Sequence, residues 1–127
     1  NLPSEIRRFE SRINHRKRVG LNDVKLNGRI KLIDLRSTSE YFGEVSPIKT
    51  AITLPWTEVL GSDYHLLGSG ELLVKKMDTL GINRFDNVVT YCTCGPRAAI
   101  GYLALKRVGY NVKVFDGGLG EWYRSYY

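Results

Sequence analysis

Short apolar runs recur along this chain of 127 residues, separated by segments in which apolar positions have helical spacing. Four runs, at residues 30–35, 51–54, 87–91 and 112–115, show little polar alternation. Such runs are typical of short parallel strands that are buried on both faces of a sheet. The pattern therefore predicts a sheet with helices packed on either side, and the Gly- and Ser-containing stretch 61–69 is expected to be a loop.

The segments between the apolar runs predict helices. Apolar residues recur at helical spacing over residues 71–80 and 97–108, and a glycine follows each segment where a helix end suits it. Shorter helices are expected over residues 38–42 and 121–126, and residues 21–26 favour either one helical turn or an edge strand. Strands that alternate with helices predict an α/β domain of three layers, with a central, mainly parallel sheet flanked by helices. Residues of the first long helix expected in the core are Leu72, Leu73, Val74, Met77 and Leu80.

The N-terminal part of the chain carries the net charge of +6. Residues 1–36 hold ten Lys and Arg against four Asp and Glu, whereas the remainder holds nine of each sign. Residues 4–13 are expected to form a short amphipathic helix, followed by a basic run over residues 14–18. We interpret residues 1–20 as a basic helical extension and residues 21–127 as the main domain. The basic run indicates either an RNA or acidic partner or, the simpler interpretation, a solvated helix end.

The strand expected over residues 87–91 leads directly to Cys92, and the chain then turns through Gly95 and Pro96 into a helix-forming run. A helix N-terminus collects backbone amides that have no internal acceptor, and it carries partial positive charge. Those amides, together with Arg97, favour the thiolate of a cysteine placed beside them. Cys92 is therefore a candidate nucleophile, on the condition that its side chain is accessible and faces the turn. The alternative is a buried cysteine that only ends a strand.

Further motifs extend this pattern over residues 21–125. Tyr91-Cys92-x-x-Gly95-x-Arg97-Ala98 is followed by an apolar helix, a strand and Asp116-Gly117-Gly118-x-x-x-Trp122. Upstream lie Leu32-Ile33-Asp34-Leu35-Arg36-Ser37, Glu40-Tyr41 and Leu54-Pro55-Trp56. This set of motifs, in this order, resembles a single-domain rhodanese, a sulfurtransferase. Rhodaneses usually continue with Gly-His-Ile-x-Gly-Ala where this chain reads Gly43-Glu44-Val45-Ser46-Pro47, so the wall of the cleft is expected to differ.

The resemblance implies a ping-pong reaction. The Cys92 thiolate takes a sulfane sulfur from a small anionic donor such as thiosulfate, holds it as a persulfide, and passes it to a thiol, cyanide or protein acceptor. Residues expected to bind the substrate or the persulfide are Thr93, Cys94, Gly95, Pro96, Arg97 and Ala98. Residues expected to support the site are Asp34, Arg36, Trp56, Gly117 and Gly118. Of these, Asp34 and Arg36 share a face by period two and are expected to pair or to bind nearby loops. Arg97 is expected either to orient the donor or to tie down the loop.

Two other functions use the same arrangement of residues. A Cys-dependent phosphatase or arsenate reductase is less favoured, because such enzymes place five residues between Cys and Arg, and this chain places four between Cys92 and Arg97. A non-catalytic rhodanese-like binding module is the second alternative, and the intact Cys92 argues against it. Cys94 is interpreted either as a resolving thiol or, slightly preferred, as a small loop residue in place of serine or glycine.

Composition limits which cofactors and partners are expected for this chain. Two cysteines in a C-x-C pair make neither a disulfide framework nor a metal site, and His15 and His65 are isolated, so no cofactor and no metal are expected. A free reactive thiol suits a reducing compartment, which predicts a cytoplasmic protein. No apolar run approaches the roughly 18 residues of a membrane helix, and no signal peptide is visible, so no membrane partner is expected.

Overall fold

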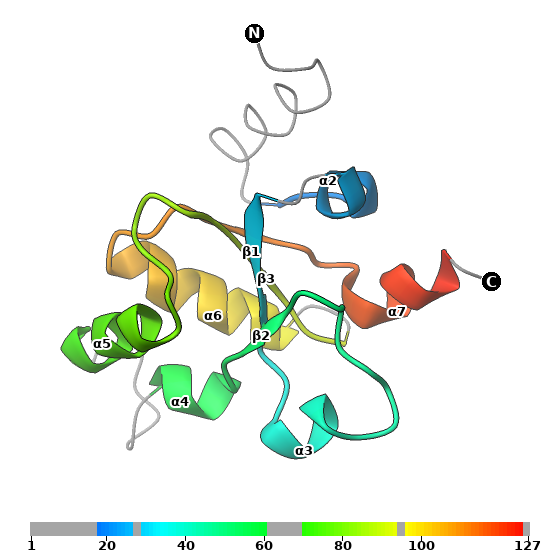
Figure 1. The fold of residues 1–127 in the computed structure, drawn as a ribbon, viewed down its shortest axis with the longest axis horizontal. Coiled ribbons are helices and arrows are strands. Elements are labelled where there is room, and N and C mark those ends of the chain that lie inside the picture. The colour runs from blue at the N-terminus through cyan, green and yellow to red at the C-terminus, as the bar shows by residue number, and fades with distance from the viewer. Residues whose placement is uncertain (1–17, 27–28, 61–69, 94–95, 126–127) are drawn as a thin grey trace, which may run out of the picture.

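A four-stranded sheet forms the centre of the fold (Figure 1). The computed structural model describes residues 18–26, 29–60, 70–93 and 96–125. The helix and the basic run expected over residues 4–18 lie outside this part of the chain except for Arg18, and so does the loop expected over 61–69. The strands are β1 (Ile30–Asp34), β2 (Ile52–Thr53), β3 (Asn87–Tyr91) and β4 (Val112–Val114).

All neighbouring strands run parallel, in the order β2-β1-β3-β4. The two central strands, β1 and β3, pair over their whole length, from Ile30 opposite Asn87 to Asp34 opposite Tyr91. An isolated parallel bridge between Arg18 and Val114 extends the sheet beside β4. Since the strands share one direction, the carboxyl ends of β1 and β3 meet at the same end of the sheet, which is where ligands bind in folds of this type.

Helices cover both faces of the sheet (Figure 1). One face carries α4 (Trp56–Leu60), α5 (Glu71–Thr79) and α6 (Pro96–Arg107), and the other carries α2 (Leu21–Leu26) and α7 (Gly118–Arg124). The short helix α3 (Thr38–Tyr41) follows β1 at the carboxyl end of the sheet. The three-layer α/β architecture with a parallel sheet, predicted from the sequence, is confirmed.

Two separate apolar clusters hold the layers together. The cluster beneath α4, α5 and α6 contains buried residues such as Ile33, Leu54, Met77 and Leu105, while Leu32, Val89, Phe115 and Leu119 pack on the opposite face. Neighbouring residues of one strand thus enter different clusters, as the alternation of side chains along a strand requires. This explains why the strands read as continuous apolar runs: each has a core on both sides.

Helix α6 lies close against the sheet because residue 101 is glycine. A Cβ placed at Gly101 would lie 2.8 Å from Cδ1 of Leu35, which is itself fully buried. The start of the same helix is fastened to β3 by the buried hydroxyl of Thr90, which donates to the carbonyl oxygen of Ala98 at 2.9 Å. The position of α6 relative to the end of β3 is therefore fixed by packing as well as by hydrogen bonding.

Several local expectations are corrected. Leu72 was expected in the core but is 73% exposed on α5, because the buried face of that short helix is filled by Leu73 and Met77. The last helix begins at Gly118 rather than at residue 121, and Trp56 opens helix α4, an element that the sequence pattern did not predict. Of the two possibilities for residues 21–26, the helix forms.

None of the helices in the described part of the chain is both long and apolar enough to cross a bilayer.

Candidate active site

Cys92 lies directly after β3, at the carboxyl end of the sheet, and three residues separate it from the start of α6. Its side chain is 1% exposed and packs in the same apolar cluster as Leu35 and Ala98. The accessible thiol expected from the sequence is therefore not found: the strand alternation that sends Tyr91 to one core sends Cys92 into the other. Cys94 and Gly95 lie outside the described residues, whereas Thr93 and Pro96 are exposed.

The first turn of α7 binds the backbone of Cys92 and Thr93. Leu119 N donates to the Cys92 carbonyl oxygen at 3.0 Å, and Gly120 N donates to the Thr93 carbonyl oxygen at 3.2 Å. Gly118 has φ +57°, and a Cβ there would lie only 2.3 Å from the Cys92 oxygen. Glycine is needed here for both the backbone conformation and the close approach. At Gly117, a Cβ would instead meet the flexible side chain of Glu121.

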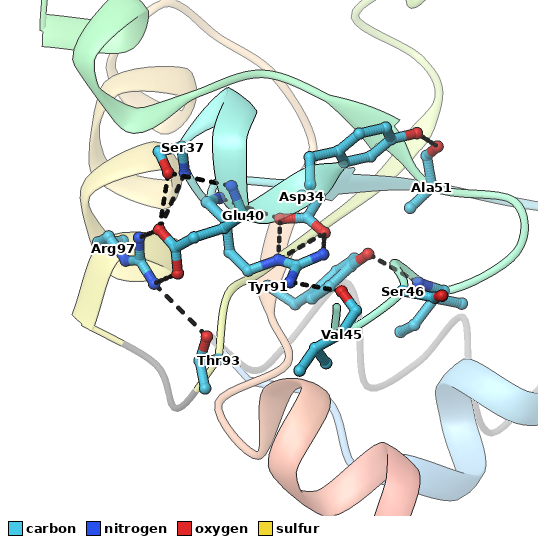
Figure 2. Close-up of polar contacts among 12 residues, drawn as sticks. Asp34, Ser37, Glu40, Val45, Ser46, Ala51, Tyr91, Thr93 and Arg97 are labelled. Atoms are coloured by element: carbon cyan, nitrogen blue, oxygen red, sulfur yellow. Dashed lines mark hydrogen bonds and ion pairs between the residues drawn. The ribbon is translucent and has the colours of Figure 1, made fainter. Parts of the chain in front are cut away.

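Arg97, at the start of α6, forms an ion pair with Glu40 of α3 (Figure 2). Its Nη1 donates to Glu40 Oε1 and its Nη2 donates to Oε2 at 3.0 Å, so the contact is bidentate. Nη2 also lies 3.5 Å from Thr93 Oγ1. Of the two roles expected for Arg97, this geometry matches the one in which it ties the loop after β3 to the rest of the fold.

Glu40 is held in place by the N-terminus of its own helix. Ser37 is the N-cap of α3: Glu40 N donates to Ser37 Oγ at 3.4 Å and Ser37 N donates to Glu40 Oε1 at 3.3 Å, which together make a capping box. Ser37 Oγ also donates to Glu40 Oε1 at 2.9 Å. The hydrogen bonds from Arg97, with smaller contributions from Ser37, lower the pKa of Glu40 from 4.5 to about 2, although partial burial opposes the shift. The same contact raises the pKa of Arg97. Both groups are therefore charged at neutral pH.

Sequence reasoning did not include Glu40 among the site residues, although the signal was present. The spacing Ser37-x-x-Glu40 is that of a capping box, which predicts the helix start but says nothing about a partner from α6. Arg97 reaches Glu40 across 57 positions of sequence. Only the pairing of β1 with β3 brings the two segments together.

The pair expected between Asp34 and Arg36 is present and buried. Arg36 Nε donates to both carboxylate oxygens at 3.1 Å, Nη2 donates to Oδ2 at 3.0 Å, and the backbone N of Arg36 donates to Oδ1 at 3.0 Å. The two side chains are 0% and 2% exposed. Arg36 Nη1 continues outward to the Val45 carbonyl oxygen at 2.9 Å, so the pair also fastens a loop, as Figure 2 shows.

The segment after α3, residues 43–48, is anchored both from the sheet and from α7. Tyr91 Oη accepts a hydrogen bond from Ile48 N at 3.0 Å, and Tyr123 of α7 donates to the Ser46 carbonyl oxygen at 2.7 Å. Burial, and then the negative charge of Asp34, raise the pKa of Tyr91 above its ordinary value, so this phenol stays protonated. The loop is thus held by Arg36, which follows β1, by Tyr91 of β3 and by Tyr123 of α7.

Trp56 is half-buried and packs against the cluster that contains Cys92. Its backbone N donates to the Leu35 carbonyl oxygen at 3.0 Å, and Leu35 lies between the two residues of the buried pair, Asp34 and Arg36. Across the residues that the structure describes, no three His, Cys, Asp or Glu side chains gather so as to hold a metal ion.

Taken together, the structure is a parallel α/β sheet with a cysteine at the carboxyl end of a central strand and a helix that begins four positions later, at the end of the sheet where ligands bind in such folds. The rhodanese-like domain model matches residues 20–125, which is most of the chain. The chain therefore belongs to the rhodanese-like domain family, and the resemblance noted in the sequence is confirmed.

Curated relatives and solved structures agree with this assignment. The chain is 31% identical over 111 residues to the sulfur carrier protein TtuD of Thermus thermophilus, matching 75% of this chain and 39% of that protein. It is 31% identical over 96 residues to a thiosulfate sulfurtransferase of Azotobacter vinelandii, matching 70% of this chain and 35% of that protein. The chain thus spans little more than a third of the length of these relatives. The human single-domain sulfurtransferase shares the fold, with a TM-score of 0.62 and 23% identity over 85% of this chain and 96% of its own.

Proposed function

We propose that this domain is a rhodanese-type sulfurtransferase in which Cys92 carries a sulfane sulfur between a donor and a thiophilic acceptor. The observation that carries the proposal is the place of Cys92, between the end of β3 and the positive end of the α6 dipole, in a rhodanese-like chain. The names of the relatives, a thiosulfate sulfurtransferase and a sulfur carrier protein, support the same chemistry.

The proposed reaction has two half-reactions. The Cys92 thiolate attacks the terminal sulfur of thiosulfate, the donor S–S bond breaks, and sulfite leaves with the bonding electron pair. Cys92 then holds the sulfur as a persulfide, whose negative charge is stabilised by the dipole of α6. In the second half-reaction an acceptor thiolate or cyanide attacks the outer sulfur and regenerates the Cys92 thiolate. No external oxidant or reductant is needed in either step.

The burial of Cys92 sets a condition on this reaction. Because the side chain is 1% exposed, the surroundings of Sγ must open locally before a donor sulfur can reach it. Proposed contacts in the open site come from the residues after the nucleophile, Thr93, Pro96 and Arg97, and from Cys94 and Gly95.

Intact-mass measurement tests the proposal. The protein is incubated separately with thiosulfate, with a cysteine desulfurase and its substrate, and with a phosphate ester. An adduct of about 32 Da, one sulfur atom, that maps to Cys92 is expected from the sulfur donors. Cys92→Ser is expected to abolish the adduct, and Cys94→Ser, the matched control, to retain most of it. Loss of the adduct in both variants would reject this division of roles.

One observation favours a second function. A buried Cys92 is what a non-catalytic binding module of the same family would show, since such a module has no need of a reachable thiol. The same experiment separates the two, because a binding module gives no adduct with any donor. Release of phosphate instead would indicate the phosphatase-like alternative.

The proposal also covers the part of the chain that carries out the reaction, its partners and its compartment. We assign sulfur transfer to residues 21–127, with residues 1–20 as a basic extension that favours a macromolecular acceptor or an RNA. A small anionic donor, a thiol, cyanide or protein acceptor, and a reducing cytoplasm fit a thiol that must stay reduced between turnovers.

A further inference from the structure

Two arginines stand near the carboxyl ends of β1 and β3, and each is held by a carboxylate of its own. Arg36 is bound by Asp34, and both are buried. Arg97, which follows Cys92 by five residues, is bound by Glu40 through both of its terminal nitrogens. At each of these two positions, the carboxylate therefore compensates the positive charge that the arginine would otherwise offer to an anionic donor.

The pair between Glu40 and Arg97 is preorganised. Ser37 fixes the carboxylate from the helix side through the capping box, and the buried contact between Thr90 and Ala98 fixes the first turn of α6. Arg97 is only 27% exposed, so its guanidinium is directed at Glu40 rather than spread over many conformations in water. A donor that recruited Arg97 would have to break a bidentate contact to do so.

This arrangement is least favourable for a donor that carries two negative charges. The repulsion between the donor and the Cys92 thiolate grows with the charge that the donor carries, and a neutralised Arg97 does little to offset it. We propose that Glu40 is a specificity-determining residue, which by neutralising Arg97 disfavours dianionic donors such as thiosulfate and leaves persulfides of small thiols or proteins as the preferred donor class. This inference rests on the proposed function.

The reaction with such a donor balances. The Cys92 thiolate attacks the terminal sulfur of R–S–SH, a Sγ–S bond forms, and the donor S–S bond breaks. The thiolate R–S⁻ leaves with the electron pair and takes a proton from solvent, while Cys92 carries –S–SH. The donor enters with a charge of zero or minus one at its reacting end, whereas thiosulfate enters with minus two.

The variant Glu40→Gln tests the proposal, since it removes the charge and keeps the size of the side chain. The second-order rate constant for adduct formation on Cys92 is measured by intact mass with thiosulfate and with cysteine persulfide. The variant leaves the positive charge of Arg97 uncompensated, so the rate constant with thiosulfate is expected to rise. Because the Glu40 side chain is 41% exposed and water screens the pair, this rise is about fivefold and not larger. The rate constant with cysteine persulfide is expected to change by less than about twofold.

Glu58→Gln is the matched control. Glu58 is a carboxylate of similar exposure, 50%, that lies 3.8 Å from Lys76 on the face carrying α4 and α5, so this variant makes the same change in net charge elsewhere. It is expected to leave both rate constants unchanged. In the double variant Glu40→Gln/Arg97→Gln, the gain with thiosulfate is expected to disappear, because the freed guanidinium is its cause.

Arg97→Gln alone provides a test that does not depend on the folding of the first variant. This change leaves the Glu40 carboxylate without its partner, so it is expected to slow the reaction with thiosulfate more than the reaction with cysteine persulfide. Equal effects on both donors in Glu40→Gln or in Arg97→Gln overturn the inference, while the sulfur adduct itself upholds the proposed function. Absence of the adduct from wild-type protein with both donors overturns the function and the inference together.

Discussion

Gly118 lies against the carbonyl group of Cys92: a Cβ at Gly118 would be 2.3 Å from that oxygen and 2.6 Å from the oxygen of Thr93. The start of α7 thus determines where the backbone of Cys92, the proposed nucleophile, lies, although 26 positions separate the two residues. This contact places Gly118, the first residue of α7, directly beside the backbone of Cys92.

Gly118→Ala is expected to destabilise the fold by roughly 2 kcal/mol or more, because alanine is strained at φ +57° and collides with rigid backbone oxygens. Urea unfolding measures the change in the free energy of unfolding. Gly120→Ala is the control, since a Cβ there would meet the Thr93 oxygen at an ordinary 3.6 Å. Equal effects of the two substitutions would show that the close approach of Gly118 has no energetic importance.

Asp34→Asn is expected to lower the free energy of unfolding by roughly 3–5 kcal/mol, because it leaves the buried guanidinium of Arg36 without its counter-charge. The exposed pair between Arg18 and Asp116, whose side chains are 74% and 48% exposed, provides the comparison. Asp116→Asn is expected to cost no more than about 1 kcal/mol. Urea unfolding of both variants measures the two changes in the free energy of unfolding. A loss of similar size in Asp34→Asn and Asp116→Asn would contradict the prediction.

Tyr91→Phe is expected to destabilise the fold by roughly 1–3 kcal/mol, since the buried amide of Ile48 would lose its acceptor. Tyr123→Phe removes a hydroxyl that binds the same loop at Ser46, but at an exposed position where water can replace it. Its effect, measured by thermal or urea unfolding, is therefore expected to be the smaller of the two. The opposite order would mean that the loop is held from α7 rather than from the sheet.

The pair between Glu40 and Arg97 makes stability depend on pH at the acidic end. The pKa of Glu40 is lowered in the folded protein from 4.5 to about 2, so the pair contributes stability above the unfolded value. That contribution is lost as the pH falls from about 4.5 towards about 2, because in this window the unfolded state binds a proton at Glu40 and the folded state does not.

Urea unfolding of wild type and Glu40→Gln across this range measures the effect. The difference between the two proteins is expected to be constant near neutral pH and to shrink through the acidic window. The effect is modest, because the carboxylate is partly exposed to water. A difference that stays the same down to the lowest pH would show that Glu40 acts through packing and not through its charge.

Some of the site could be read from the sequence because its signals are local. The apolar runs predicted the strands, the order Cys92-Gly95-Pro96-Arg97 predicted a strand followed by a turn and a helix, and the spacing of Asp34 and Arg36 predicted their common face. Each of these depends on residues only a few positions apart, where the geometry of one element decides the outcome.

The burial of Cys92 and the partner of Arg97 could not be read in this way. Both depend on segments distant in the chain: Leu35, which follows β1, and Ala98 of α6 share the buried cluster of Cys92, and Glu40 reaches Arg97 from α3. The sequence by itself thus determined the elements, the family and the candidate nucleophile. Only the tertiary structure decided which charges neutralise one another and how far the thiol is from solvent, because both follow from the register of β1 on β3 and from side-chain packing.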